Sequence, residues 1–220
     1  MNYYVLMNDY KSSVIPRYLH AIIDTKKQVN NNWDYNGSEY SFPYYMKEPE
    51  CPNQLFLLCN KNIGALRFNY YNHGASHIVS DNFVDLFSNL KICEVISKKL
   101  IATSIKDGNI LRDDFNYMYF ISDDTLLDFN RSELEEDRFG SLIPHKLTIN
   151  NPHCIDVFTL NSTLLADFLF LSEHAAEIFV KMKVSGVKIV KLDDAFKNYC
   201  IDYRYDIESK RKNYHNVNIE

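Results

Sequence analysis

The sequence predicts an α+β fold, with a mixed, mostly antiparallel sheet, two strand-helix-strand units and a few short helices. Three observations support this prediction. Short apolar or β-branched runs outnumber the segments with helical periodicity along the 220 residues. One strand-helix-strand pattern occurs twice. Strands and helices do not alternate regularly, which favours an α+β fold over a doubly wound one.

The repeated pattern begins with an apolar run that ends in a serine, first at Ser80 and again at Ser172. Each serine is followed by an acidic residue and a helical pattern, so its hydroxyl is expected to cap the helix while the acid favours the first turn. Alignment on the serines also matches an acid, a branched apolar residue and a phenylalanine. The matched positions are Asp85, Leu86 and Phe87 in the first copy and Glu177, Ile178 and Phe179 in the second.

Apolar residues in each predicted helix recur every three or four positions and form one face. These faces comprise Phe83, Leu86, Phe87 and Leu90 in the first helix, and Ala175, Ile178, Phe179 and Met182 in the second. Neither face contains a nucleophile or a metal ligand, so the duplication predicts a scaffold. Gly186 is expected to end the second helix in the left-handed conformation, and Asn89 the first.

The remaining elements are predicted in chain order from apolar alternation and turn residues. Strands are expected at residues 2–7, 18–23, 117–121, 146–149 and 154–159, with a hairpin formed by residues 54–59 and 65–70. Residues 26–46 are expected to form a long loop. Short helices are expected at residues 132–137 and 193–199.

The chain contains no linker rich in Pro, Gly or Ser. We therefore expect a single domain over residues 1–192, with two pseudo-equivalent lobes of about residues 1–122 and 123–192. Residues 193–220 are expected to form a C-terminal extension that is partly disordered.

Several blocks of apolar and turn residues, taken together, form a recognisable sequence pattern. They are NYYVLM at residues 2–7, NWDYNG at 32–37, FP at 42–43, PNQLF at 52–56, and the two repeat units. This pattern resembles the immunity proteins of bacterial polymorphic toxin systems, especially immunity family 43 and the related family 11. The resemblance spans most of residues 1–192. It implies a protein that binds and neutralises a cognate secreted toxin domain and has no catalytic, metal or cofactor site of its own.

Charge supports a protein partner. The net charge of -5 argues against direct binding of nucleic acid, which depends on clustered Lys and Arg. Acids are concentrated in residues 113–137, where Arg131 is the single base. They would attract a basic toxin domain, such as a nuclease, or form a solvated face without a partner. They are Asp113, Asp114, Asp123, Asp124, Asp128, Glu133, Glu135, Glu136 and Asp137.

Aromatic residues supply a second set of candidate contacts. The chain has 16 Tyr and 14 Phe, and aromatic side chains of this kind are enriched at recognition surfaces, although most are expected in the core. The loop at residues 26–46 contains the toxin-binding candidates Trp33, Tyr35, Tyr44 and Tyr45.

Two other classes of function remain open at this point. A metal-dependent hydrolase could use Asp113-Asp114 with Asp123-Asp124 if the strand between these pairs brought them together. A structural subunit could bury its Tyr-rich surface in a homo-oligomer. No Gly-rich phosphate loop, Gly-x-Ser-x-Gly or His-Glu-x-x-His motif is present.

The cysteines indicate a reducing compartment, because they are five in number and include no Cys-x-x-Cys pair. Cys93 and Cys154 are expected to be small buried hydrophobes. The N-terminus lacks the pattern of a signal peptide, and the apolar runs are too short to span a bilayer. We therefore expect a cytoplasmic protein with no membrane partner.

Overall fold

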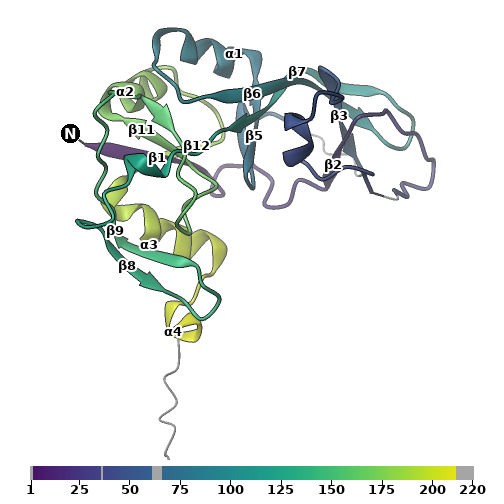
Figure 1. Ribbon diagram of the computed structural model, residues 1–220. Helices are drawn as coiled ribbons and strands as arrows, with labels where there is room; N and C mark the ends of the chain where they lie inside the picture. Colours follow the sequence, from purple (N-terminus) through teal and green to yellow (C-terminus); the bar gives the residue numbers. More distant parts are fainter. Residues whose placement is uncertain (1, 36, 61–65, 212–220) are drawn as a thin grey trace, which may run out of the picture.

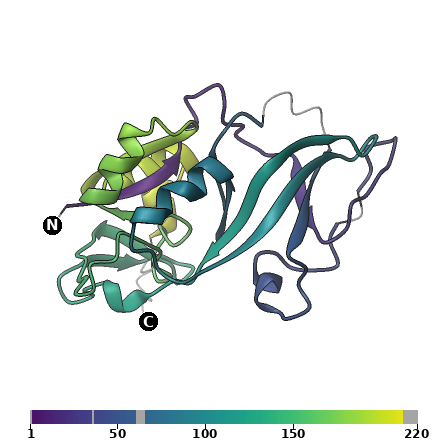
Figure 2. The ribbon, with the colours of Figure 1, turned by 90° about the horizontal axis from the view of Figure 1, so that it is seen from above.

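The computed structural model describes residues 2–35, 37–60 and 66–211 (Figure 1). Within these residues the strands form three sheets and the helices are short, which confirms the predicted α+β class. The largest sheet extends as an arm to one side of the molecule. The smaller sheets and the C-terminal helices lie on the other side (Figures 1 and 2).

The arm is a six-stranded sheet with the order β2-β3-β6-β7-β5-β4. Its pairs are antiparallel except for β3 with β6, which is parallel. The long β6–β7 hairpin forms its spine. The strands are β2 (Ala21–Asp24), β3 (Gln54–Cys59), β4 (Tyr70–His73), β5 (Ser76–Ser80), β6 (Val95–Ser104) and β7 (Ile110–Phe120).

The second sheet has four antiparallel strands in the order β10-β11-β1-β12. The inner strand β1 comes from the start of the chain, whereas the inner strand β11 and the two edge strands come from residues 157–191. The strands are β1 (Tyr3–Asn8), β10 (Val157–Phe158), β11 (Leu169–Ser172) and β12 (Val187–Lys191).

The third sheet is a hairpin formed by β8 (Glu133–Glu136) and β9 (Leu142–Lys146). The described α-helices are α1 (Asp81–Val84), α2 (Glu173–Lys181), α3 (Leu192–Tyr203) and α4 (Ile207–Lys210). Short 3-10 turns are η1 (Tyr44–Lys47), η2 (Asp85–Asn89), which continues α1, and η3 (Asp124–Leu126).

Both copies of the repeated sequence pattern fold as a split β-α-β unit. In the first unit, β5 and β6 flank α1 in the chain and are separated in the sheet by the antiparallel strand β7. In the second unit, β11 and β12 flank α2 and are separated by β1. The predicted caps are also present. The Ser80 hydroxyl accepts the Phe83 N–H at 3.3 Å, and the Ser172 hydroxyl accepts the Ala175 N–H at 3.2 Å.

Two apolar cores hold these sheets. One lies against the six-stranded sheet. The other joins the four-stranded sheet to α1, α2 and α3, and also includes Tyr70, Val79 and Met118 of the six-stranded sheet. The repeat units meet in the second core, where the Phe179 ring lies 5.2 Å from Phe83 and 6.2 Å from Phe87. These T-shaped and tilted ring contacts fix α2 beside α1.

The two larger sheets are also joined by hydrogen bonds. Asn8, at the end of β1, is 1% exposed. Its side-chain oxygen accepts the Asn72 N–H at 2.8 Å, and its amide donates to the Asn72 carbonyl at 3.2 Å. β4 is the edge strand of the six-stranded sheet that lies next to β1. The two bonds satisfy backbone groups of β4 where the sheets meet.

Three predicted local elements are wrong. The strand expected at residues 146–149 lies earlier, because β9 ends at Lys146. Residues 54–59 and 65–70 do not form a hairpin, because β3 pairs with β2 and β6, whereas β4 begins at Tyr70 and pairs with β5. Residues 61–65, which include most of the expected turn, lie outside the described residues. The segment predicted as a helix at residues 132–137 is the strand β8, since its pairing with β9 overrides a weak helical pattern.

The predicted helix ends also need correction. The left-handed residue directly after α2 is Lys183 (φ 51°), whereas Gly186 (φ 90°) lies nearer to β12. A Cβ on Gly186 would lie 2.6 Å from Ile15 Cδ1, so this glycine permits close packing. Asn89 is not left-handed, because the chain leaves η2 directly into extended Leu90.

The cysteines are all free. Cys93 is buried, as predicted, but Cys154 is exposed. The prediction for Cys154 fails because this residue sits in a turn with a positive φ of 50°, and only the following strand β10 enters the core.

Candidate functional site

The acidic candidates occupy two separate places because β7 is fully extended. Asp113 and Asp114 lie in its first half, and Asp123 and Asp124 follow its end. At about 3.3 Å per residue, the seven steps from Asp113 to Phe120 span about 23 Å. The strand therefore holds the two acid pairs apart, contrary to what the hydrolase interpretation required. Within the described ranges, no three His, Cys, Asp or Glu side chains are grouped to hold a metal ion.

Asp114 is engaged by its neighbour on the strand. The Arg112 guanidinium donates to Asp114 at 2.9 Å and holds the pKa of that carboxyl below its usual range. Arg112 also donates to the Phe68 carbonyl at 2.7 Å and lies over the Phe115 ring. Asp113 points to solvent on the opposite face of β7 and has no ion pair among the described residues.

Asp123, Asp124 and Asp128 build the loop that follows β7. Asp123 accepts the Thr125 N–H at 3.0 Å, and Asp124 accepts the Asn161 N–H at 2.7 Å. The Ser162 hydroxyl also donates to Asp124. Asp128 accepts the Arg131 N–H at 3.2 Å and forms a 3.7 Å ion pair with its guanidinium. Their hydrogen bonds give these three acids a local structural role.

Glu135 and Asp137 attach the C-terminal segment to the β8–β9 hairpin. Glu135 is hydrogen-bonded to the His145 ring at 2.7 Å and accepts from Arg211 at 3.0 Å, and these two partners lower its pKa. Asp137 is 2% exposed and accepts the Tyr205 hydroxyl at 3.0 Å. Burial alone would raise the pKa of Asp137, but this bond and the N–H groups of two neighbouring residues lower it.

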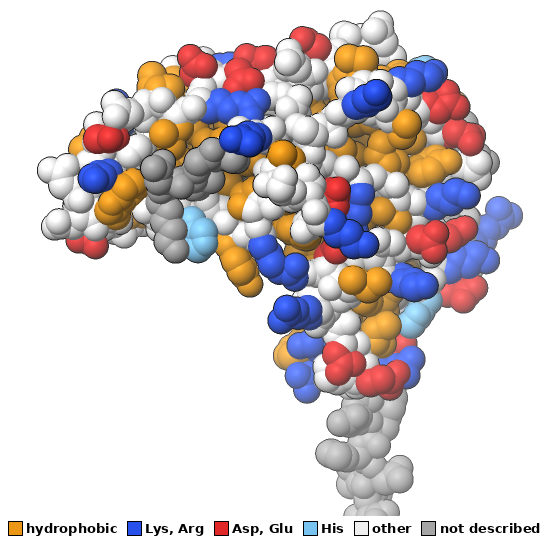
Figure 3. All heavy atoms as spheres, turned by 180° about the vertical axis from the view of Figure 1, so that it is seen from behind, with side chains coloured by type: hydrophobic (Ala, Val, Ile, Leu, Met, Phe, Trp, Pro, Cys, Tyr) orange, Lys and Arg blue, Asp and Glu red, His pale blue; other side chains and the backbone are white. Residues whose placement is uncertain are grey.

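The two other acids of this hairpin remain at the surface. Glu133 is exposed, and its carboxylate lies 3.8 Å from the Lys146 ammonium. Glu136 is also exposed. Opposite charges are interspersed on the face shown in Figure 3, where Lys and Arg side chains lie among the Asp and Glu side chains. The acids accessible to a partner are therefore fewer than the sequence suggested.

The aromatic candidates also lie in different places, with Trp33 and Tyr35 apart from Tyr44 and Tyr45. Trp33 lies beside Lys106, just after β6, with the ammonium 6.0 Å from its ring. The Tyr35 hydroxyl donates to Asp24 at 2.8 Å, and burial together with this carboxylate raises the pKa of Tyr35. The Tyr44 ring meets Tyr119 edge-on at 6.2 Å.

Trp33 and Tyr44 lie at opposite ends of the β6–β7 hairpin, because Lys106 belongs to the turn whereas Tyr119 pairs with Ile96 near the start of β6. Tyr44 is 57% exposed. Tyr45 is half-buried and stacked on Tyr40 at 3.9 Å. Each end of the hairpin thus presents its own aromatic surface.

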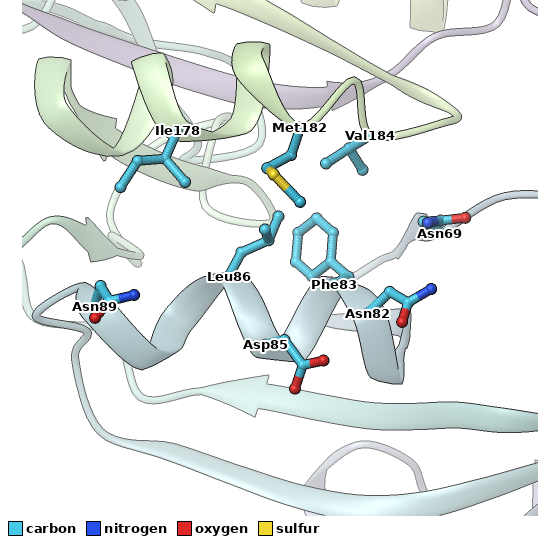
Figure 4. Close-up of a pocket in the computed structure, with 9 residues that line it drawn as sticks. All are labelled: Asn69, Asn82, Phe83, Asp85, Leu86, Asn89, Ile178, Met182 and Val184. Carbon is cyan, nitrogen blue, oxygen red and sulfur yellow. The ribbon is translucent and has the colours of Figure 1, made fainter.

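The structure adds a site that sequence reasoning missed, a groove between α1–η2 and α2 (Figure 4). Its volume is about 470 Å³. The apolar lining residues are Phe83, Leu86, Ile178, Met182 and Val184, and the polar ones are Asn69, Asn82, Asp85 and Asn89. In Figure 4 the Asp85 carboxylate points away from α2. Leu86 and Ile178 are matched positions of the repeat. The sequence signal was therefore present, but it predicted packed core faces.

Comparisons with known proteins identify the family of this chain. A search of curated proteins finds no match. None of the helices in the described part of the chain is long and apolar enough to cross a membrane. The family model described as "Immunity protein 43" matches residues 7–207. The match continues beyond residue 193 and includes α3, so that helix is part of the family's shared unit. The chain belongs to the immunity protein 43 family, a family of immunity proteins of polymorphic toxin systems.

Proposed function

We propose that this protein binds its cognate toxin domain in the cytoplasm and neutralises it by covering the toxin's active site or substrate groove. The observation that carries the proposal is the family match over residues 7–207, because an immunity protein implies a toxin partner. In this mechanism, a preformed surface of the immunity protein blocks access to the toxin and performs no chemistry of its own.

Electrostatic steering supports a basic toxin, such as a nuclease. The chain carries a net charge of -5, and Asp113, Glu133 and Glu136 are exposed. Exposed charges of this kind accelerate encounter with an oppositely charged partner more than they strengthen the final complex. All nine acids of residues 113–137 were candidates, and these three are the best placed to act at long range.

Exposed aromatic side chains supply candidate anchors for the docked complex. Tyr44 offers a largely exposed ring, whereas Tyr35 and Trp33, which lies beside Lys106 at the other end of the hairpin, are half-buried. Aromatic residues in the centre of an interface contribute much of the binding energy once water is excluded.

Charge reversal at single exposed acids tests the acidic contact. The toxin domain encoded beside this gene is titrated with Glu133→Lys and, as a matched variant on the arm, Asp113→Lys. If the β8–β9 hairpin faces the toxin, Glu133→Lys lowers the association rate about tenfold and weakens its salt dependence, while Asp113→Lys has little effect. The opposite result would assign the contact to the arm.

Asp123 and Asp124 are less suitable for this test because their reversal would break the loop that they hold. Equal association rates and equal salt dependence for the wild type and both variants would exclude an acidic interface. Failure of the wild type to bind the toxin, and to protect cells that express it, would contradict the proposed function itself.

A further inference from the structure

We propose that a pocket between β4 and α3, at the junction of the two larger sheets, binds the ammonium or guanidinium group of a toxin Lys or Arg side chain. The inference rests on the proposed function and names a contact residue, Asp167, that lies outside the acidic segment 113–137. Three features of this junction pocket support it, which are its aromatic walls, a carboxylate without a cation, and walls that are already fixed.

Aromatic rings form much of the wall of the junction pocket, whose volume is about 330 Å³. On α3, the Tyr199 and Tyr203 rings stack with their centroids 4.9 Å apart. The Tyr203 ring also meets Phe168 and Tyr10 edge-on, at 6.0 Å and 6.1 Å. Tyr71 lines the pocket from β4. Aromatic rings attract a cation that lies over their faces, and more strongly where water is partly excluded.

Asp167 places a negative charge beside these rings. It lines the pocket, and its carbonyl accepts a hydrogen bond from the Asn72 side chain on β4. Burial raises the pKa of Tyr199, and the Asp167 carboxylate raises it further. Burial also raises the pKa of Tyr70, and the same carboxylate contributes to that rise. A charge shifts another group's pKa in this way only at close range, so the Asp167 carboxylate lies near the tyrosine hydroxyls.

No cation pairs with the Asp167 carboxylate in the part of the chain that the structure describes. Neighbouring protein removes part of its hydration, and this desolvation raises the pKa of Asp167. Cations of adjoining segments are engaged elsewhere. Lys188 pairs with Asp202 at 2.6 Å, and Arg17 lies over the Tyr10 ring and donates to the Asp202 carbonyl. A cation supplied by a partner would therefore replace the interactions with water that Asp167 has lost.

The walls of the junction pocket are fixed before any partner arrives. The Asn8 side chain, which holds the backbone of Asn72 on β4, also donates to the Tyr10 hydroxyl at 3.1 Å. The Tyr10 hydroxyl lies 3.4 Å from the Tyr203 hydroxyl on α3. These bonds connect β1, β4 and α3 around the pocket. A preorganised site loses little conformational entropy on binding.

A matched pair of charge removals tests the carboxylate. Asp167→Asn removes the charge and keeps the size of the side chain, and Asp85→Asn makes the same change at an exposed position on η2 outside the pocket. We expect Asp167→Asn to weaken binding of the toxin domain about tenfold, and Asp85→Asn to change it by less than about threefold. A melting temperature of Asp167→Asn no lower than that of the wild type would show that this loss does not come from unfolding.

The aromatic wall is tested at Tyr203, which is 41% exposed. Tyr203→Leu removes the ring, whereas Tyr203→Phe keeps it and removes only the hydroxyl. We expect Tyr203→Leu to weaken binding about tenfold and Tyr203→Phe to weaken it by less than about threefold. Equal losses in the two variants would assign the contact to the hydroxyl and contradict a cation over the ring.

Replacements in the toxin identify the occupant. Each Lys and Arg of the toxin domain is changed to Ala and measured against both the wild type and Asp167→Asn. For the residue that enters the pocket, the replacement should cost at least about fivefold less affinity against Asp167→Asn than against the wild type. The absence of such coupling at every Lys and Arg would overturn the inference.

The outcomes separate the inference from the proposed function. If the wild type binds the toxin and both Asp167→Asn and Tyr203→Leu bind equally well, the inference is wrong while the proposed function stands. If the wild type neither binds nor protects, both fail. If the wild type sediments as a dimer that Asp167→Asn dissociates without loss of toxin binding, the pocket binds a second copy of this chain and the inference is overturned.

Discussion

At the scale of single residues, burial decides the chemistry of His77. This side chain is 1% exposed, shares a 2.9 Å hydrogen bond with the Tyr70 hydroxyl, and meets the Phe120 ring edge-on at 5.4 Å. Burial, reinforced by nearby His73, lowers the pKa of His77 to about 3. The imidazole is therefore neutral in the folded protein at ordinary pH, and its role is to pack the core.

This shift predicts how stability depends on pH. Because the pKa of His77 is about 6.5 in the unfolded chain and about 3 in the folded protein, only the unfolded chain takes up this proton as the pH falls below 6.5. The free energy of unfolding should decrease by about 1.5 kcal/mol between pH 6.5 and pH 5. Urea unfolding at pH 6.5 and at pH 5 measures this decrease in the free energy of unfolding.

Most carboxylates contribute little in that interval, because their unfolded pKa values lie near 4. Burial raises the pKa of Asp167, so this group acts in the opposite direction to His77. His77→Gln should remove the part of the dependence that His77 supplies, since Gln has no proton to take up. Burial also lowers the pKa of His73, so a smaller dependence of the same sign should remain. An unchanged difference between the two pH values in His77→Gln would show that another group is responsible.

At the scale of elements, the two split β-α-β units use their serines differently. Ser80 caps α1 through one hydrogen bond. Ser172 caps α2 and also donates its hydroxyl to Asp156 at 2.6 Å. The second cap therefore anchors the turn before β10 as well as its own helix.

Replacement of each serine by alanine should separate these roles. Ser80→Ala is expected to reduce the free energy of unfolding by about 1 kcal/mol, the usual value of an N-cap. Ser172→Ala should cost about 1 kcal/mol more, because it also leaves the Asp156 carboxylate without its hydroxyl donor. Thermal unfolding of both variants gives the comparison, and equal losses would contradict the additional role of Ser172.

At the scale of the whole molecule, the two larger sheets share one core, in which Tyr70 and Met118 of the arm lie with Phe170 of the other sheet, and the reciprocal bonds of Asn8 and Asn72 add to this junction. The extended arm and the β8–β9 hairpin place the candidate contacts far apart (Figure 1). The relative position of the sheets therefore determines whether one partner can contact both surfaces at once.

Asn8→Ala tests this junction. The substitution leaves the buried N–H and carbonyl of Asn72 without their partner, which should cost about 1–3 kcal/mol. Amide exchange should accelerate in β4, and Asn2→Ala, which removes an exposed side-chain bond to Glu173, should leave β4 unchanged. Unaltered exchange in β4 for Asn8→Ala would show that packing alone joins the sheets.

Local features were predictable from sequence because their signals act within a few residues. Ser80 and Ser172 cap helices because a hydroxyl before an amphipathic segment finds its N–H partner three residues later. The α+β class followed from periodicity in the same way. The exposure of the candidate acids was less predictable. Asp137, for example, is buried and hydrogen-bonded to Tyr205, which is 68 residues away in the chain.

Taken alone, the sequence determined the duplicated strand-helix-strand units, their serine caps and the family resemblance. The tertiary structure alone decided which strands pair, because β3 finds β6 and β1 inserts between β11 and β12 through contacts distant in the chain. It also decided that matched apolar positions leave an open groove. Periodicity reports which face of a helix is apolar, but only the distance between two packed helices determines whether that face is filled.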